Sequence, residues 1–282
     1  MPIRIILSSL FFALATGLFA QSNLSWESAL KNKKASLNVY YYENNYPFTY
    51  KEKGNVIVKG IEADILNEFV GWAKKKGVVI TLNYIASAEF NKSYELLTKG
   101  TPNSIGLSSL TITEDRKKEI QFCPPYLKNK TVLISSGRIP TLSKIQDISL
   151  HFDTLTAITE KGSTHEKYLL DLKSSYFPKM RIEFGEENPT VKINQNAKYF
   201  GYVDMIQFWS FLKKNNSSYI KMHRVATIDN ERFAFGLPLN SDWQAAFNEF
   251  FESGFGFIST KKYRSILETH LSSEVIESVE LD

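Results

Sequence analysis

The sequence predicts an α/β architecture built in two similar halves. Two observations support this prediction: extended runs alternate with helical patterns, and the alternation begins again near residue 154. Such alternation is typical of α/β folds, in which helices cover a sheet. The chain has 282 residues, of which 43% are hydrophobic and 13% aromatic, so each half is large enough to bury its own core.

The first half opens with the tyrosine-rich extended run Leu37–Tyr42, and Lys53-Gly54-Asn55 predicts a hairpin turn. Gly60–Lys76 places its apolar residues on one helical face and is followed by Gly77, a typical helix stop. The other elements expected here are a buried strand at Val78–Tyr84, a helix at Phe90–Lys99, a strand at Ser104–Leu107, a helix at Glu114–Ile120 and a strand at Thr131–Ser135.

The second half repeats the alternation and ends in helices. A capping box, Ser241-Asp242-Trp243-Gln244, is expected to open the first of the closing helices. The periodicity predicts strands at Thr154–Thr159, Arg181–Phe184 and Tyr199–Val203, extended segments at Tyr219–His223 and Phe233–Leu237, and helices at Thr164–Leu172, Met205–Lys214, Ser241–Ser253 and Lys261–His270.

The N-terminus has the pattern of a secretory signal peptide. Arg4 precedes an apolar run, Ile5–Phe19, that is short for a membrane span. We expect a signal peptide at residues 1–20, cleavage near Ala20 and a soluble mature protein in the periplasm. An uncleaved membrane anchor is the alternative.

Composition argues against several classes of function. The formal net charge is +4 and the basic residues are scattered, which argues against nucleic-acid or membrane binding. Cys123 is the single cysteine, and the four histidines do not form a metal-ligand spacing. We therefore expect no internal disulfide, no metal site and no cofactor.

Three segments place polar side chains where a strand ends. The first is Gly106–Arg116, a strand followed by a hydroxyl-rich turn and an expected helix start that bears an arginine. Ligands gather at such ends in α/β sheets, and a guanidinium can hold a carboxylate there. The alternative is a plain capping box, with Arg116 paired to Glu114 or Glu119 on the surface.

The other two segments have the same form. Glu160–Glu166 is a strand end, a glycine turn and a helix start, and its alternative is a simple helix cap. Tyr199–Asp204 ends in a single acid, which either meets a ligand ammonium group or caps the helix that follows.

Several motifs, taken in order, resemble the bacterial extracellular solute-binding proteins of family 3, the amino-acid receptors of ABC importers. These motifs are Pro47-Phe48, Gly60-Ile61-Glu62-Ala63-Asp64-Ile65, Leu110-Thr111-Ile112-Thr113-Glu114-Asp115-Arg116, Phe122-Cys123-Pro124-Pro125-Tyr126 and the later Gly162-Ser163-Thr164. The similarity covers nearly all of the mature chain.

The resemblance implies the two-lobed type II periplasmic-binding-protein fold, with two hinge strands and a ligand cleft between the lobes. It implies that residues 21–134 and the return segment 232–282 form lobe 1, and that residues 135–231 form lobe 2.

The resemblance also implies roles for individual residues. Arg116 corresponds to the clamp for a ligand α-carboxylate, and Asp204 to the partner of its α-ammonium group. Tyr46, with Phe90, corresponds to the aromatic wall of the side-chain pocket, although Tyr46 stands one residue later than the family's usual aromatic. The hydroxyl residues expected to add hydrogen bonds are Ser109, Thr111 and Thr164.

The function implied is capture of an amino acid or a similar small carboxylate without catalysis, by a monomer that serves the membrane permease of an ABC importer. One alternative is a cleft enzyme resembling prephenate or arogenate dehydratases, for which Glu160 and His165 are the nearest candidate acids, although we expect both to be exposed turn residues. Another alternative is a sensory binding module.

Overall fold

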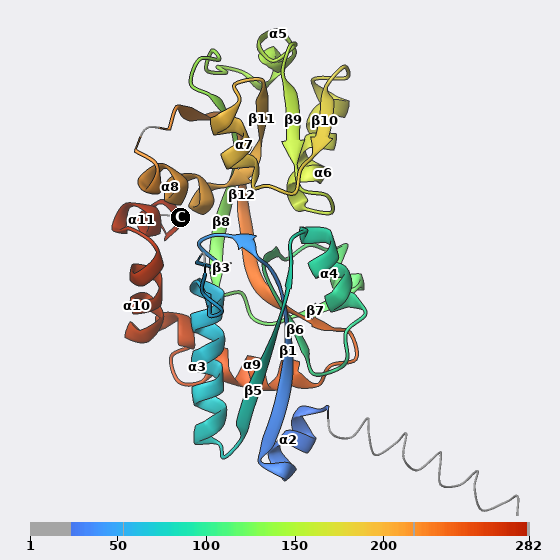
Figure 1. The fold of residues 1–282 in the computed structure, drawn as a ribbon, viewed down its shortest axis with the longest axis vertical. Helices are drawn as coiled ribbons and strands as arrows, with labels where there is room; N and C mark the ends of the chain where they lie inside the picture. Colours follow the sequence, from blue (N-terminus) through green and yellow to red (C-terminus); the bar gives the residue numbers. More distant parts are fainter. Residues whose placement is uncertain (1–23, 53, 217, 281–282) are drawn as a thin grey trace, which may run out of the picture.

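The computed structural model describes residues 24–52, 54–216 and 218–280. The two halves predicted from the sequence are joined by one mixed sheet, with strands in the order β10-β9-β11-β8-β12-β6-β1-β5 and with β7 paired to β12. Helices surround both ends of this sheet (Figure 1). The α/β prediction is confirmed.

We call the lower part of Figure 1 lobe 1. Its strand β1 (Lys34–Tyr42) pairs in parallel with β5 and β6, so the carboxyl ends of these strands meet at the same edge. The lobe contains β5 (Val79–Ser87), β6 (Ser104–Thr111), β7 (Ile120–Phe122), α2 (Trp26–Asn32), α3 (Ile61–Lys75), α4 (Phe90–Thr98), α9 (Trp243–Glu252) and α10 (Lys261–His270).

We call the upper part lobe 2. Its strand β9 (Thr156–Thr159) pairs in parallel with β10 and β11. The lobe contains β10 (Arg181–Phe184), β11 (Tyr199–Asp204), α5 (Ile148–His151), α6 (Thr164–Ser175), α7 (Pro189–Gln195) and α8 (Met205–Lys214).

Two long antiparallel strands, β8 (Leu127–Ser136) and β12 (Ile220–Pro238), run through both lobes (Figure 1). The two extended segments expected at 219–223 and 233–237 are parts of this one strand, whose register shifts between His223 and Glu231. The lobe boundaries expected at 134/135 and 231/232 both fall inside these strands.

Each lobe has its own aromatic core. In lobe 1, Phe69 of α3 stacks on Phe247 of α9 with ring centroids 3.9 Å apart, and Trp243 is fully buried beside them. In lobe 2, the rings of Phe152 and Phe200 meet edge to face at 4.8 Å. Because α9 follows lobe 2 in the sequence, the lobe 1 core contains residues from both before and after lobe 2.

Three local predictions are wrong for physical reasons. The helix expected at 114–120 is a single 3-10 turn, η1 (Arg116–Lys118), because the next residues pair with β12 as β7. The strand expected to be buried, β5, is an edge strand with alternating exposed residues. The N-cap of α9 is Asp242, whose carboxylate accepts the backbone N–H of Trp26 at 2.8 Å and so caps α2 instead.

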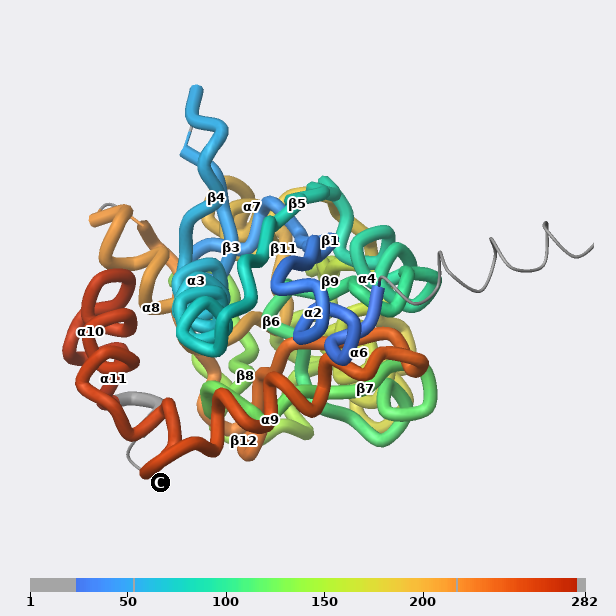
Figure 2. The backbone as a smooth tube through the Cα atoms, turned by 90° about the horizontal axis from the view of Figure 1, so that it is seen from below, coloured from blue at the N-terminus to red at the C-terminus, as the bar shows by residue number. Residues whose placement is uncertain are grey.

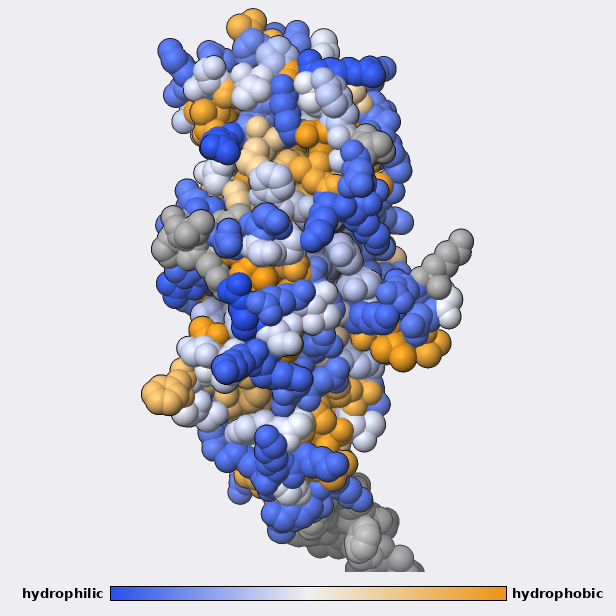
Figure 3. Space-filling model, turned by 90° about the vertical axis from the view of Figure 1, so that its left-hand side faces the viewer, coloured by the Kyte–Doolittle hydropathy of each residue, from blue (hydrophilic) through white to orange (hydrophobic). Residues whose placement is uncertain are grey.

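A small antiparallel sheet projects from lobe 1. It consists of β2 (Asn44–Asn45), β3 (Thr49–Lys51) and β4 (Val58–Lys59), and the last two pair antiparallel on either side of the expected hairpin turn, of which Lys53 lies outside the described residues. Figure 2 shows this segment extending away from the body, and Figure 3 shows hydrophobic surface on its underside. Val56 and Ile57, in the hairpin turn, are largely exposed.

The C-terminal helix α11 (Ser273–Glu280) contacts α8 and β8 near the junction of the lobes. Sequence patterns did not predict α2, α7 or α11. The expected signal peptide at residues 1–20 lies outside the described residues. Within the described ranges, no helix is both long and apolar enough to span a bilayer.

Candidate functional site

A small polar pocket lies between the lobes where β1 and β6 of lobe 1 face α6 and β11 of lobe 2. Its volume is about 30 Å³. Six of the seven ligand-binding residues expected from the sequence line it: Phe90, Ser109, Thr111, Arg116, Thr164 and Asp204. We call it the inner pocket.

Arg116 is the buried cation of the inner pocket, with 8% of its surface exposed. Its guanidinium donates to the carbonyl oxygen of Thr111 at 3.1 Å and, across the cleft, to that of Gly162 at 3.3 Å. It also lies 5.3 Å from the ring centroid of Phe90 and 5.4 Å from that of Tyr94. Rings and carbonyls therefore fix the plane of the guanidinium.

The surface ion pair considered for Arg116 does not form. Glu114 pairs with Lys117 at 2.7 Å, and Glu119 accepts the hydroxyl of Tyr94 at 2.8 Å. Among the described residues, no carboxylate lies within ion-pair distance of Arg116. Burial lowers the pKa of its guanidinium, because a charged group loses solvation in the interior. A carboxylate ligand would supply the missing countercharge.

Asp204 ends β11 and is the N-cap residue of α8, but its side chain makes no capping hydrogen bond. Its Oδ1 accepts the side-chain amide of Asn129 at 2.8 Å and lies 3.3 Å from Nε2 of His165. The simple capping role is therefore wrong. The carboxylate faces β8 and the cleft, and it already holds polar partners from the protein.

A second buried acid, Glu231 of β12, stands next to Asp204. The Asn129 amide also donates to Glu231 at 2.9 Å, and Tyr168 and Thr131 donate their hydroxyls to the same carboxylate. Burial, followed by the nearby Asp204, raises the pKa of Glu231. Sequence reasoning missed this cluster, because its members come from β8, α6 and β12.

Glu160 and His165 belong to the inner pocket, so the expectation of exposed turn residues is wrong for both. Glu160 accepts the hydroxyl of Tyr42 at 2.7 Å across the cleft, and burial raises the pKa of its carboxyl group. Burial is the largest influence on the pKa of His165 and lowers it, but Asp204, Glu231 and Glu160 together outweigh burial, and the net shift is upward. Both groups lie on lobe 2's side of the cleft.

The hydroxyl residues play different local roles. Ser163, rather than Thr164, caps α6, since its Oγ accepts the backbone N–H of Glu166 at 3.2 Å. Ser109 has a φ of 43°, which is uncommon for a residue with a side chain. Its N–H donates to Glu62 at 3.0 Å, which holds this part of β6 against α3.

Glu62 supports the pocket from below. The first turn of α3 donates to the carbonyls of Pro47 and Phe48, and this places Glu62 beneath Ser109. A side chain at Gly60 would put its Cβ 2.1 Å from the carbonyl oxygen of Phe48, so only glycine fits there. Glu62 is fully buried and also accepts the hydroxyl of Tyr126 at 2.8 Å. Burial raises the pKa of its carboxyl group to about 8.

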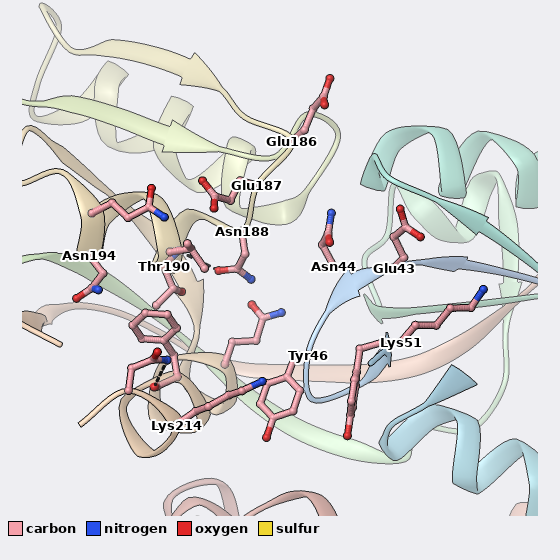
Figure 4. Close-up of a pocket in the computed structure, with 16 residues that line it drawn as sticks. Glu43, Asn44, Tyr46, Lys51, Glu186, Glu187, Asn188, Thr190, Asn194 and Lys214 are labelled. Atoms are coloured by element: carbon pink, nitrogen blue, oxygen red, sulfur yellow. Dashed lines mark hydrogen bonds between the residues drawn. The ribbon is translucent and has the colours of Figure 1, made fainter. Parts of the chain in front are cut away.

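Tyr46 is the one expected residue that the structure places elsewhere. It lines a second interlobe pocket of about 770 Å³, which we call the outer pocket (Figure 4). The preceding residue, Asn45, lines the inner pocket instead. The sequence signal for position 45 was the register of the motif around Pro47-Phe48, because in the resemblance described above the usual aromatic stands one residue before Tyr46.

Comparisons with known structures identify the fold. A putative binding component of an ABC transporter from Wolinella succinogenes, solved with lysine, is 17% identical with a TM-score of 0.66 and covers 86% of this chain and 98% of its own. A substrate-binding protein of an ABC uptake transporter from Streptococcus pneumoniae, with bound histidine, is 16% identical with a TM-score of 0.67 and covers 90% and 98%. An ancestral amino-acid-binding protein, described as a precursor of cyclohexadienyl dehydratase, is 19% identical with a TM-score of 0.64 and covers 87% and 98%.

These likenesses confirm the two-lobed fold. No curated protein sequence matches the chain. The sequence model of one family, however, matches residues 37–269, which is most of the chain. The protein therefore belongs to the bacterial extracellular solute-binding proteins, family 3.

Proposed function

We propose that the protein captures an amino acid or a similar small carboxylate in the inner pocket and delivers it to the permease of an ABC importer. The observation that carries this proposal is the buried guanidinium of Arg116, which faces the interlobe pocket without a carboxylate partner among the described residues. A buried charge without a countercharge is costly, so binding of a carboxylate is favoured there.

The other residues of the inner pocket fit this role. Ser109, Thr111 and Thr164 supply hydroxyl groups, and Asp204 supplies a carboxylate for an ammonium group. Phe90 packs an aromatic wall against the clamp. We assign no catalytic role to these residues.

Motion of the lobes about β8 and β12 opens the pocket in this proposal. Polar contacts join the lobes across the cleft, among them Tyr42 with Glu160 and Asn45 with Gln207. A few such hydrogen bonds contribute only about 0.5–1.5 kcal/mol each, so opening is accessible and a bound ligand shifts the balance toward closure. The apolar sequence of residues 1–20 and membership of an extracellular family support the proposal of export to the periplasm.

A thermal-shift screen tests the proposal. The purified mature protein is heated with individual amino acids, with small carboxylates and with the matching amino-acid amides. A ligand at about a hundred times its Kd raises the free energy of unfolding by roughly 2.7 kcal/mol. We expect stabilisation by a carboxylate and not by its amide. Equal stabilisation by both, or no response to any carboxylate, would refute the assignment.

One observation favours a second candidate, a cleft enzyme of the dehydratase kind. Glu160 lies in the inner pocket, and the pKa of its carboxyl group is raised. A raised pKa favours the protonated form, which a general acid needs in order to protonate a leaving hydroxyl group. Incubation with prephenate or arogenate, followed by detection of the aromatic product, tests it. Recovery of the substrate unchanged at high protein concentration would reject the enzyme.

A further inference from the structure

The outer pocket lies beside the candidate site. At about 770 Å³ it has the size of a small-ligand site, whereas the inner pocket has about 30 Å³. Figure 4 shows that its walls come from both lobes: Glu43, Asn44 and Tyr46 on one side, and Asn188 and Thr190 on the other.

A hydrogen bond between the lobes lies at the border of the two pockets. Gln207 lines both, and its side-chain amide donates to Oδ1 of Asn45 at 2.9 Å. Asn45 also contacts Ser109, whose hydroxyl lines the inner pocket. The hydroxyl of Tyr42 lies at the same border, 2.7 Å from Glu160 of the inner pocket and 3.3 Å from the carbonyl oxygen of Glu186 of the outer pocket. A ligand that spans both pockets would have to displace such contacts, which contribute about 0.5–1.5 kcal/mol each.

The walls of the outer pocket suit a peptide backbone. The amide side chains of Asn44 and Gln195 each carry a donor and an acceptor, the same pair of groups that a peptide unit presents. Asn188 and Asn194 add amide donors, because their oxygens already accept the backbone N–H groups of Thr190 and Tyr219. The rings of Tyr46 and Phe211 supply apolar surface between them.

A buried hydroxyl in the outer pocket also points to a polar ligand. Thr190 is 1% exposed, and its Oγ1 has no hydrogen-bond partner among the described residues. Buried hydroxyl groups are nearly always hydrogen-bonded, so each unpartnered one needs an explanation. Thr190 belongs to the pocket wall, and a bound polar group would satisfy its hydroxyl once the wall opens around it.

The rim of the outer pocket, which charged residues of both lobes form (Figure 4), carries more acid than base. Its acids are Glu43, Glu186 and Glu187, and its bases are Lys51 and Lys214. Lys214 is turned onto the ring of Tyr46, with its Nζ 4.7 Å from the ring centroid. A ligand ammonium group is therefore favoured at this rim.

We propose that the ligand is a short peptide of two or three residues, with its terminal carboxylate at Arg116 and its N-terminal part in the outer pocket. This inference rests on the proposed carboxylate clamp. Asp204 supports it, because Oδ1 already holds Asn129 and His165, and a peptide N–H needs one acceptor where an ammonium group needs three. The small inner pocket requires a small C-terminal residue such as glycine.

A chain-length series tests the proposal by calorimetric titration of the full-length mature protein. The probes are glycine, glycylglycine and triglycine, which share one carboxylate end. We expect the affinity to rise about tenfold or more from glycine to triglycine, since one or two new hydrogen bonds suffice for that gain. Equal affinity along the series, or a preference for the free amino acid, would overturn the peptide assignment.

Variants locate the effect in the outer pocket. Thr190→Val keeps the shape of the side chain and removes its hydroxyl, and Glu187→Gln removes one charge from the rim. Each variant should lower the affinity for triglycine several-fold and leave the affinity for glycine unchanged. The matched controls are Thr154→Val and Glu252→Gln, which lie outside both pockets. If triglycine binds the two pocket variants as tightly as the controls, the outer pocket is not used.

Arg116→Ala separates this inference from the proposed function. Loss of both glycine and triglycine binding in Arg116→Ala supports the clamp, whatever the chain-length series gives. If triglycine still binds Arg116→Ala with full affinity, the carboxylate clamp itself is wrong, and the peptide orientation falls with it.

Discussion

Glu62 makes the stability of the protein fall as the pH rises. Its carboxyl group is fully buried below Ser109, and its pKa is raised from 4.5 to about 8 by burial, which its hydrogen bonds to Tyr126 and Ser109 only partly offset. The folded state therefore binds a proton that the unfolded state releases above about pH 4.5.

The magnitude follows from proton linkage. Between pH 4.5 and 8 the group is protonated in the folded state and ionised in the unfolded state, so its contribution to stability falls by about 1.4 kcal/mol per pH unit. Over the whole interval the loss is on the order of 5 kcal/mol. The stabilisation is fully present below the unfolded pKa and is lost as the pH approaches the folded pKa.

Urea unfolding of wild type and Glu62→Gln at several pH values measures this contribution. Glutamine keeps an oxygen for the Tyr126 hydroxyl and the Ser109 N–H but does not titrate. We expect the difference in free energy of unfolding between the two proteins to shift steadily in favour of the variant as the pH rises. Glu68→Gln, which changes a partly exposed acid of α3 paired with Lys262, serves as the control.

Parallel pH profiles for wild type and Glu62→Gln would refute this reasoning. Other buried groups, such as Glu160 and His165, also have raised pKa values and give a slope of the same sign. Only the difference between the two proteins isolates Glu62.

Three further predictions concern single side chains. If Asp204 holds the ammonium group, Asp204→Asn should weaken the binding of an amino acid more than that of the hydroxy acid of the same shape, by up to about 2–5 kcal/mol. Equal losses of binding free energy in calorimetry would assign Asp204 a structural role. Tyr42→Phe leaves the Glu160 carboxylate without its 2.7 Å donor and should lower the free energy of unfolding by about 1–3 kcal/mol, measured with urea; an unchanged value would mean that this contact is dispensable. Cys123 is buried with a raised thiol pKa, so it should react with a thiol reagent only after unfolding, and fast labelling of the native protein would contradict its burial.

The sequence predicts elements best where local pattern and packing agree. The bounds of β10, α8 and α10 match the predicted ranges at 181–184, 205–214 and 261–270. The helix expected at 114–120 failed because Ile120–Phe122 pairs with β12, more than a hundred residues later in the chain. A local pattern carries no information about such a partner.

The candidate site was likewise predictable where local motifs define it and not where distant segments pack together. Motif order indicated Arg116 and the hydroxyl residues around it, and the structure brings them into one pocket with Asp204. Neither the stacking of Tyr94 on Arg116 nor the bridge from Asn129 to Glu231 could be read from sequence spacing, because these contacts depend on how distant strands and helices pack. Tyr46 lines the outer pocket rather than the inner one, so its role as an aromatic wall for the ligand stays a prediction.

Calorimetric titration of Arg116→Ala with the best ligand from the thermal-shift screen tests the central claim most directly. Lys117→Ala, on the same 3-10 turn but exposed and paired with Glu114, is the matched control. The carboxylate clamp predicts that the folded Arg116→Ala protein loses nearly all affinity, while Lys117→Ala binds like wild type. Unchanged affinity in folded Arg116→Ala would contradict the account.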